Sequence, residues 1–233
     1  MTGGAALLFD LDGTLVASDA KHMAAFQRVF APYGLVLDQA AYNRSIHGAS
    51  NELIGKVFLS HLPVERQLAI LEEKEAVYRA DLGDIEPIAG AIALLDFADR
   101  HGLRRALVTN APRANAEAVL AALGFEERLR TVVIGSELSR AKPDPLPYLR
   151  ALELTRSVAW RSVAFEDSVP GIRAAAAAGL AVVGLTTSLD EAALIHAGAS
   201  FAVNDFTDPR IFVLIERRIA ARVGTRVGEE TPV

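Results

Sequence analysis

Short runs of apolar residues recur along the chain, separated by longer stretches of mixed polarity. Within each run the apolar character is continuous and does not alternate with polar residues, which is typical of parallel strands covered on both faces. These runs predict six buried strands: Ala5–Phe9, Ala106–Val108, Val132–Ile134, Val163–Phe165, Ala181–Leu185 and Phe201–Val203.

Helical patterns lie between these runs. Three of them end before a glycine, the residue that most easily adopts the left-handed conformation past a helix end: Ala91–His101 before Gly102, Ala114–Leu123 before Gly124, and Ile172–Ala178 before Gly179. Strands that alternate with helices in this way form right-handed βαβ units. The predicted fold class is therefore α/β, with a Rossmann-like, doubly wound parallel sheet.

One long stretch, residues 17–83, interrupts the alternation because it has helical patterns and no strand-like run. We expect it to form a small α-helical domain, joined to the core by linkers near Val16–Asp19 and Gly83–Pro87. The α/β core then comprises residues 1–16 and 84–233. The polar tail Val223–Val233 is expected to be poorly ordered.

The composition of the chain excludes several classes of function. A chain of 233 residues suits a core with a smaller insertion, and its net charge of −5 argues against a nucleic-acid-binding protein. It contains no cysteine, which excludes disulfides and cysteine-ligated metal centres. No targeting signal is evident, and no apolar stretch reaches the roughly 20 residues that span a bilayer. We therefore expect no membrane partner and a cytoplasmic location.

Polar residues follow four of the predicted strands. Asp10 and Asp12 follow the first strand, Thr109 and Asn110 the second, Lys142 lies after the third, and Glu166 and Asp167 follow the fourth. Each has an ordinary alternative, such as a solvated Asp-Gly turn, a helix cap or a surface charge. Because sites in parallel sheets form beyond the carboxyl ends of strands, their joint occurrence predicts one site that handles a phosphoryl group and a divalent cation.

In this order, the four motifs resemble those of the haloacid dehalogenase superfamily, over nearly the whole chain. The helical insertion resembles the small α-helical cap of β-phosphoglucomutases, phosphoglycolate phosphatases and sugar phosphatases. Three segments are similar to broad-range sugar phosphatases: Val108–Arg113, Ile134–Glu137 and Gly184–Thr187.

The resemblance implies a role for each core motif. Asp10 is implied as the nucleophile that forms an aspartyl-phosphate, and Asp12 as the general acid and base. Thr109 and Lys142 are implied as donors to the phosphoryl oxygens. The implied Mg²⁺ ligands are Asp10, the backbone carbonyl of Asp12, Asp167 and Glu166, the last directly or through water.

Asp12 also indicates the reaction class, because dehalogenases and phosphonate hydrolases of the superfamily lack this second acid and transport ATPases carry a lysine there. Its presence favours a phosphatase or a phosphomutase. Substrate contacts are expected from Asn110 and from five residues of the helical insertion: His22, Gly48, Ser50, Asn51 and Lys74.

Three of these five positions bear on the alternatives. His22 matches a histidine near the mutase's catalytic acid, although a helical histidine is more often a packing or surface residue. Asn51 stands where the mutase has an arginine for a second phosphate, and Lys74 can instead pair with neighbouring glutamates on a solvated face. His47, His61, His101 and His196 show no metal-ligand spacing and are assigned no function.

The sequence thus predicts a Mg²⁺-dependent phosphatase of small phosphorylated metabolites, sugar phosphates above all. The alternatives are a β-phosphoglucomutase-like mutase, then a phosphoglycolate phosphatase, and, outside enzymes, a catalytically silent metabolite-binding protein of the same fold. The sequence does not indicate the oligomeric state.

Overall fold

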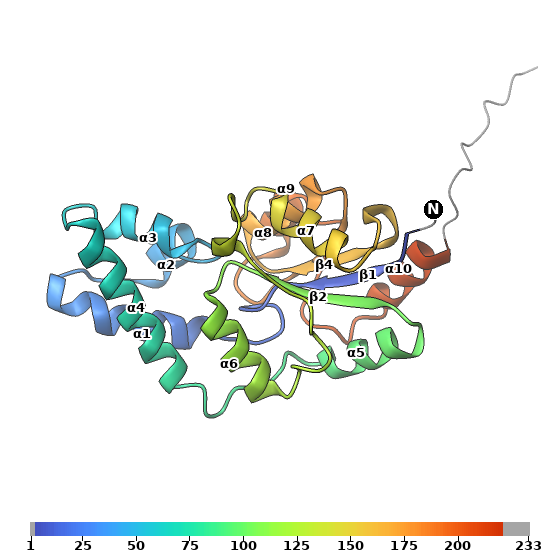
Figure 1. The fold of residues 1–233 in the computed structure, drawn as a ribbon, viewed down its shortest axis with the longest axis horizontal. Helices are drawn as coiled ribbons and strands as arrows, with labels where there is room; N and C mark the ends of the chain where they lie inside the picture. The colour runs from blue at the N-terminus through green and yellow to red at the C-terminus, as the bar shows by residue number, and fades with distance from the viewer. Residues whose placement is uncertain (1–2, 221–233) are drawn as a thin grey trace, which may run out of the picture.

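A six-stranded sheet, with every strand parallel to its neighbours, runs through the computed structural model, which describes residues 3–220. All six predicted strands form, in the order β3-β2-β1-β4-β5-β6 (Figure 1). The strands are β1 (Ala6–Phe9), β2 (Arg104–Thr109), β3 (Val132–Ile134), β4 (Val163–Glu166), β5 (Ala181–Leu185) and β6 (Phe201–Val203). This order confirms the predicted doubly wound α/β fold.

Helices cover both faces of the sheet (Figure 1). One face is covered by α7 (Leu146–Leu154), α8 (Val169–Ala177) and α9 (Glu191–Ala197), and the other by α5 (Ala91–Arg100), α6 (Arg113–Leu123) and α10 (Pro209–Ala220). The described residues also form short 3-10 segments: η1 (Ala31–Tyr33), η2 (Gly135–Glu137) and η3 (Ala159–Arg161). Helices α5, α6 and α8 end as predicted before glycines with positive φ, namely Gly102, Gly124 and Gly179.

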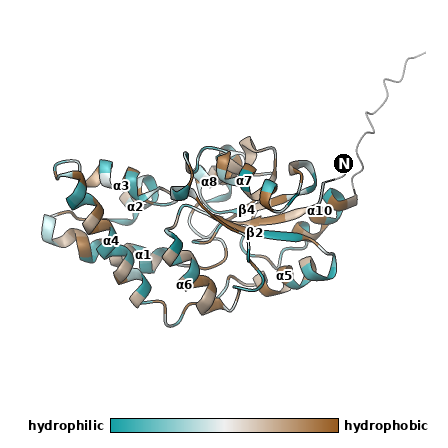
Figure 2. Cartoon of the chain, in the orientation of Figure 1, coloured by the Kyte–Doolittle hydropathy of each residue, from teal (hydrophilic) through white to brown (hydrophobic). Residues whose placement is uncertain are grey.

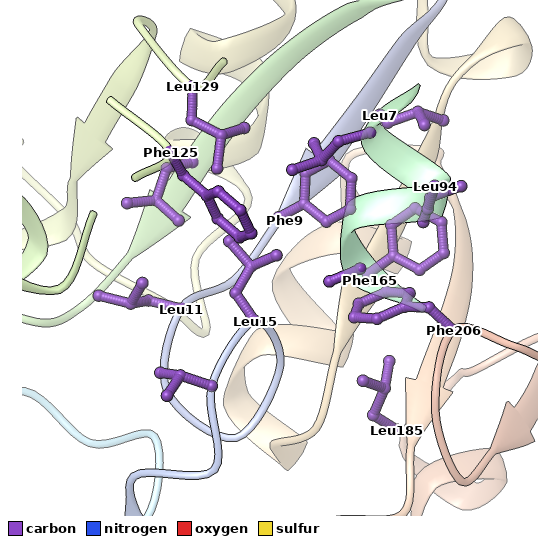
Figure 3. Close-up of a cluster of buried hydrophobic side chains, with 14 of the residues drawn as sticks. Leu7, Phe9, Leu11, Leu15, Leu94, Phe125, Leu129, Phe165, Leu185 and Phe206 are labelled. Carbon is purple, nitrogen blue, oxygen red and sulfur yellow. The ribbon is translucent and has the colours of Figure 1, made fainter. Parts of the chain in front are cut away.

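The side chains of β1 alternate between the two faces, and this alternation divides the core. Leu7 and Phe9 pack into the cluster under α5, α6 and α10, whereas Leu8 packs into the cluster under α7, α8 and α9. Figure 3 shows the first cluster, in which the rings of Phe9 and Phe165 stack with centroids 5.0 Å apart. Two buried faces explain why the strands read as continuous apolar runs.

The four remaining helices, on the left of Figure 1, lie within the predicted insertion: α1 (Asp19–Phe30), α2 (Gln39–Ser45), α3 (Asn51–Phe58) and α4 (Val64–Ala80). They enclose a hydrophobic cluster of their own, which includes Phe26, Phe30 and Tyr42. Figure 2 shows hydrophilic and hydrophobic segments alternating along α1, as expected for a helix with one buried apolar face.

Two adjacent linkers connect these helices to the sheet. Val16 bridges Pro87, and the Ile88 amide donates to the Leu15 carbonyl at 2.9 Å. We propose that the chain divides as the sequence predicts, into a core of residues 1–16 and 84–233 and a helical cap of residues 17–83.

The predicted tail Val223–Val233 lies outside the described residues. Among residues 3–220, no helix is both long and apolar enough to cross a membrane.

Candidate active site

The strand order places the polar strand ends side by side. β1 lies at the centre of the sheet, with β2 on one side and β4 on the other, so the strand order reverses its direction at β1. In parallel sheets a crevice opens at the carboxyl ends of the strands where the order reverses. Asp10 follows β1, Thr109 ends β2 and Glu166 ends β4. Thr109 does not cap the following helix, because its Oγ1 accepts a hydrogen bond from the amide of Ala111 at 3.0 Å. The sheet topology thus brings three of the predicted motifs together.

Lys142, the fourth motif, reaches into the same crevice. Its Nζ lies 2.6 Å from Asp10 Oδ1 and 2.5 Å from Glu166 Oε1, and Tyr148 donates its hydroxyl to Glu166 at 2.7 Å. Burial alone lowers the pKa of Lys142, but the two neighbouring carboxylates outweigh burial and raise it. Lys142 therefore carries its positive charge inside the protein, and a surface role is excluded.

Three carboxylates crowd around this lysine. Asp10, Glu166 and Asp167 each offer an oxygen within 4.8 Å of the others, and all three are buried. Burial raises the pKa of Asp10 well above its usual range; Lys142 opposes that rise, and the charges of Glu166 and Asp167 add to it. Burial also raises the pKa of Asp167. A buried all-oxygen set with this excess of acid fits a hard divalent cation such as Mg²⁺.

Gly13 allows Asp167 to approach the turn after β1. Gly13 has φ +75°, and a Cβ at this position would lie 1.8 Å from Asp167 Oδ2. Any other residue would displace that carboxylate and strain the turn. Thr14 Oγ1 donates to the other oxygen of Asp167 at 3.4 Å. The Asp-Gly-Thr sequence therefore shapes the acidic cluster as well as the turn.

Asp12 faces the cap, away from the acidic cluster. Its Oδ1 lies 2.6 Å from Ser18 Oγ, 3.0 Å from His22 Nε2 and 3.2 Å from the Tyr78 hydroxyl. Burial raises the pKa of Asp12, whereas the contacts with His22 and Ser18 lower it to about 2. The Asp12 side chain is thus held as a carboxylate against His22 and Tyr78 of the cap. Only the backbone carbonyl of Asp12 is then left for the predicted metal site.

His22 is itself positioned by Lys74. Lys74 Nζ lies 2.8 Å from His22 Nδ1 and 3.0 Å from Glu75 Oε2, and its side chain is buried. Because an ammonium group only donates, His22 Nδ1 accepts this bond and Nε2 carries the proton that faces Asp12. The alternative for Lys74 is therefore half right: this lysine does pair with a neighbouring glutamate, Glu75, but the pair is buried and does not lie on a solvated face.

His47, to which the sequence assigned no function, lies in the site. Its Nε2 is 2.8 Å from Asp167 Oδ2, and Ser188 donates to the same oxygen at 3.2 Å. Burial lowers the pKa of His47, but Asp167 and Asp19 outweigh burial and raise it to about 9. The sequence signal was its place directly before Gly48, in the loop already predicted to contact substrate.

Most of the predicted residues line one cavity between cap and core: Asp10, Asp12, His22, Gly48, Asn51, Lys74, Thr109, Asn110, Lys142 and Asp167. Asn110 joins the two parts, since its Nδ2 donates to the Gly48 carbonyl at 3.1 Å and to the Lys142 carbonyl at 3.2 Å. Two predicted residues do not line this cavity. Glu166 is buried beneath it, and Ser50 Oγ accepts from the Leu53 amide at the start of α3.

Several residues of the site were not foreseen because they carry no motif. Ser18 precedes α1 as a capping serine normally does, but its hydroxyl donates to Asp12 and makes no cap bond. Tyr78 stacks on His22 with ring centroids 3.8 Å apart. Glu75 and Asn115, from the cap and the core, are both fully buried and hydrogen-bonded to each other at 2.6 Å.

Comparisons with known proteins identify the family. Residues 5–179 match the family of haloacid dehalogenase-like hydrolases. Validoxylamine A 7'-phosphate phosphatase of Streptomyces hygroscopicus subsp. limoneus is 34% identical, over 87% of this chain and 94% of the relative. A phosphorylated carbohydrates phosphatase of Thermotoga maritima is 30% identical, over 83% of this chain and 91% of the relative. Among solved structures, Rhodobacter sphaeroides CbbY in complex with phosphate is 29% identical, with a TM-score of 0.77 over 88% of this chain and 95% of that one.

Proposed function

The chain belongs to the haloacid dehalogenase-like hydrolase family, and from this premise we propose that it is a Mg²⁺-dependent phosphatase of small phosphorylated metabolites, chiefly sugar phosphates. The observation that carries the proposal is the pairing of Asp10, held by Lys142 at 2.6 Å, with a second acid, Asp12, in the same cavity. The sugar-phosphate assignment is supported by two relatives, one named as a validoxylamine A 7'-phosphate phosphatase and the other as a phosphorylated carbohydrates phosphatase.

Asp10 is the proposed nucleophile. One of its carboxylate oxygens attacks phosphorus, the bond to the leaving oxygen breaks, and Asp10 becomes an aspartyl-phosphate. Lys142 and the Thr109 hydroxyl lie beside Asp10 in the cavity and can donate to the transferring phosphoryl oxygens. When bound by Asp10, Asp167, the Asp12 carbonyl and Glu166, Mg²⁺ supplies positive charge that keeps Asp10 ionised and offsets the phosphate charge.

Asp12 is the proposed acid and base. An arriving phosphate adds negative charge beside Asp12, and this raises the pKa of the carboxyl and favours its protonated form in the complex. Asp12 then gives its proton to the leaving oxygen. In the second step its carboxylate takes a proton from water, the water oxygen attacks phosphorus, and Asp10 is released with inorganic phosphate. His22 Nε2–H orients Asp12 throughout.

Metal removal tests the proposed function. In Mg²⁺ we expect phosphate release from at least one member of a panel of sugar monophosphates. A chelator should lower kcat/KM by about 100-fold or more, because a bound ion supplies several kcal/mol of charge stabilisation. Added Mg²⁺ should restore the rate, and heat-inactivated protein serves as the blank. Turnover that is unchanged in chelator would refute the metal dependence.

The same panel separates the alternatives. A mutase gives an isomerised sugar phosphate in place of free phosphate, and a phosphoglycolate phosphatase acts on phosphoglycolate above all sugars. Ligand binding in Mg²⁺ without any product would indicate a metabolite-binding protein.

Asp12→Asn tests the acid and base role. Turnover of sugar monophosphates should fall by about 10²- to 10⁴-fold, since asparagine cannot transfer the proton. With p-nitrophenyl phosphate, whose leaving group needs no acid, the first step should persist and the second should stall. We therefore expect a burst of about one equivalent of p-nitrophenol per protein in stopped-flow absorbance. Asp84→Asn, at an exposed position, is the matched control and should behave as wild type. Steady turnover without a burst in the Asp12 variant contradicts the assignment.

A further inference from the structure

Three residues of the helical cap, Asn51, Lys74 and Glu75, line part of the cavity. Their hydrogen bonds join none of them to Asp10, Glu166 or Asp167, and we place the distal end of the substrate, the end that is not hydrolysed, against them. Lys74 and Glu75 come from α4, and both side chains are almost completely buried. Their hydrogen bonds decide which chemical groups this end of the cavity can accept.

Lys74 has no donor left for a substrate anion. An ammonium group has three N–H bonds. In Lys74 these face His22 Nδ1 at 2.8 Å, Glu75 Oε2 at 3.0 Å and the ring of Phe26, whose centroid is 4.3 Å from Nζ. Binding a second phosphate or carboxylate would break one of these buried contacts. Lys74 therefore positions His22 and does not offer an anion site.

Glu75 retains an acceptor. Its Oε1 accepts from Asn51 Nδ2 at 2.8 Å, and its Oε2 accepts from Lys74 Nζ and, at 2.6 Å, from Asn115 Nδ2. Arg79 donates to Asn115 Oδ1 at 2.8 Å, which fixes the amide so that its NH₂ group faces Glu75. A carboxylate accepts about four hydrogen bonds, and three are used here. One acceptor position of Glu75 is left for a ligand.

The other charges around the cavity reinforce this preference. Among the lining residues, Asp12 and Asp19 add further carboxylates near the cap. The other basic groups of the lining are also engaged, Lys142 by Asp10 and Glu166, and His47 by Asp167 at 2.8 Å. A second anion on the substrate would thus meet acceptors and carboxylates without an available cation, in a site where water screens charge poorly.

We propose that Glu75 is a specificity-determining residue, which selects monophosphates whose distal end carries hydroxyl or amino groups and rejects those with a second anionic group. This inference rests on the proposed phosphatase function and names the substrate class within it. It also gives Asn51 a role, since Asn51 orients Glu75 and contributes no charge of its own.

The test uses matched substrates that differ only at the distal group. Glycerol 3-phosphate ends in CH₂OH where 3-phosphoglycerate ends in a carboxylate. In Mg²⁺, wild-type kcat/KM should favour the neutral member by at least about tenfold, as expected for an unpaired charge placed beside a buried carboxylate. Glu75→Gln should reduce this ratio by about tenfold, because the glutamine keeps the shape and loses the charge. Glu73→Gln, on the exposed face of the same helix, should leave the ratio unchanged.

A second variant covers the case in which Glu75→Gln does not fold. Asn51→Lys adds a cation beside Glu75 at a half-buried position and should also lower the ratio. The Tm shift that each compound produces is measured in parallel, because it reports binding without turnover. Equal kcat/KM values, or an equal or larger Tm shift with 3-phosphoglycerate, would overturn the inference. Absence of phosphate release from every member of the sugar monophosphate panel in wild type would overturn the proposed function instead, because that result does not depend on the charge of the distal group.

Discussion

Replacing Asp10 with asparagine is expected to lower phosphate release from every substrate by at least about 10³-fold, in line with the loss of a catalytic nucleophile in other hydrolases. The amide is nearly isosteric with the carboxylate, but it has no anionic oxygen to attack phosphorus. The change also removes one of the three acids that lie within 4.8 Å of one another. Since burial holds the pKa of Asp10 well above its usual range, and Lys142 keeps its pair with Glu166 in the variant, losing this acid should not destabilise the metal-free fold.

Three measurements check this prediction. Steady-state phosphate release gives the rate, intact-mass spectrometry of acid-quenched samples detects the aspartyl-phosphate, and thermal unfolding reports the fold. Wild type should show a phosphorylated species that the variant lacks, with Tm of the metal-free variant equal to or above that of wild type. Undiminished turnover, or a phosphorylated species in the variant, would exclude Asp10 as the nucleophile.

Lys142→Met is expected to reduce both stability and activity. Methionine preserves the apolar stem and removes a charge that lies 2.6 Å from Asp10 and 2.5 Å from Glu166. Two buried carboxylates then lose their partner, and breaking a buried ion pair in this way costs about 3–5 kcal/mol. We expect kcat/KM to fall by about 10²- to 10³-fold as well, as for the loss of one preorganised donor to the phosphoryl oxygens.

The pH dependence identifies the cause of the instability. In the variant, Asp10 loses the lysine that opposes the rise of its pKa on burial, so the penalty is fully present at pH values above this raised pKa. It is relieved as the pH falls and Asp10 binds a proton. Urea unfolding in chelator should therefore show a larger difference from wild type at neutral than at acidic pH.

Lys56→Met is the matched control for this prediction, since Lys56 forms an exposed pair with Glu52 on α3. An exposed pair of this kind contributes about 0–1 kcal/mol. A difference of that small size in the Lys142 variant would contradict the buried-network interpretation.

The core of the site could be predicted because parallel sheets collect their strand ends at one edge. Asp10, Thr109 and Glu166 needed only the position of each strand and the rule that sites form beyond carboxyl ends. The apolar runs located those strands because both faces of the sheet are covered, so each run is continuous. Lys142 was placed by its position after the third run.

The cap residues were harder to predict because helical spacing does not show which surface will be covered. On α4, Lys74 has glutamates on both sides, and a solvated charged face was as consistent with the sequence as a buried lysine. Leu53 and Val57, which continue an apolar helical pattern on α3, are instead half-exposed. His47 gave no spacing signal, because its partner Asp167 is 120 residues away.

The sequence by itself determined the strands, the helix ends, the order of the motifs and the acids available for chemistry, because each depends on short-range patterns and local backbone preferences. The tertiary structure alone decided which charges are buried and what they contact. Burial of Lys74 and Glu75, the raised pKa of His47 and the contact of Asp12 with Tyr78 all require the cap to pack against the core. Desolvation and charge interactions sum over all surrounding atoms, and here those atoms come from segments far apart in the chain.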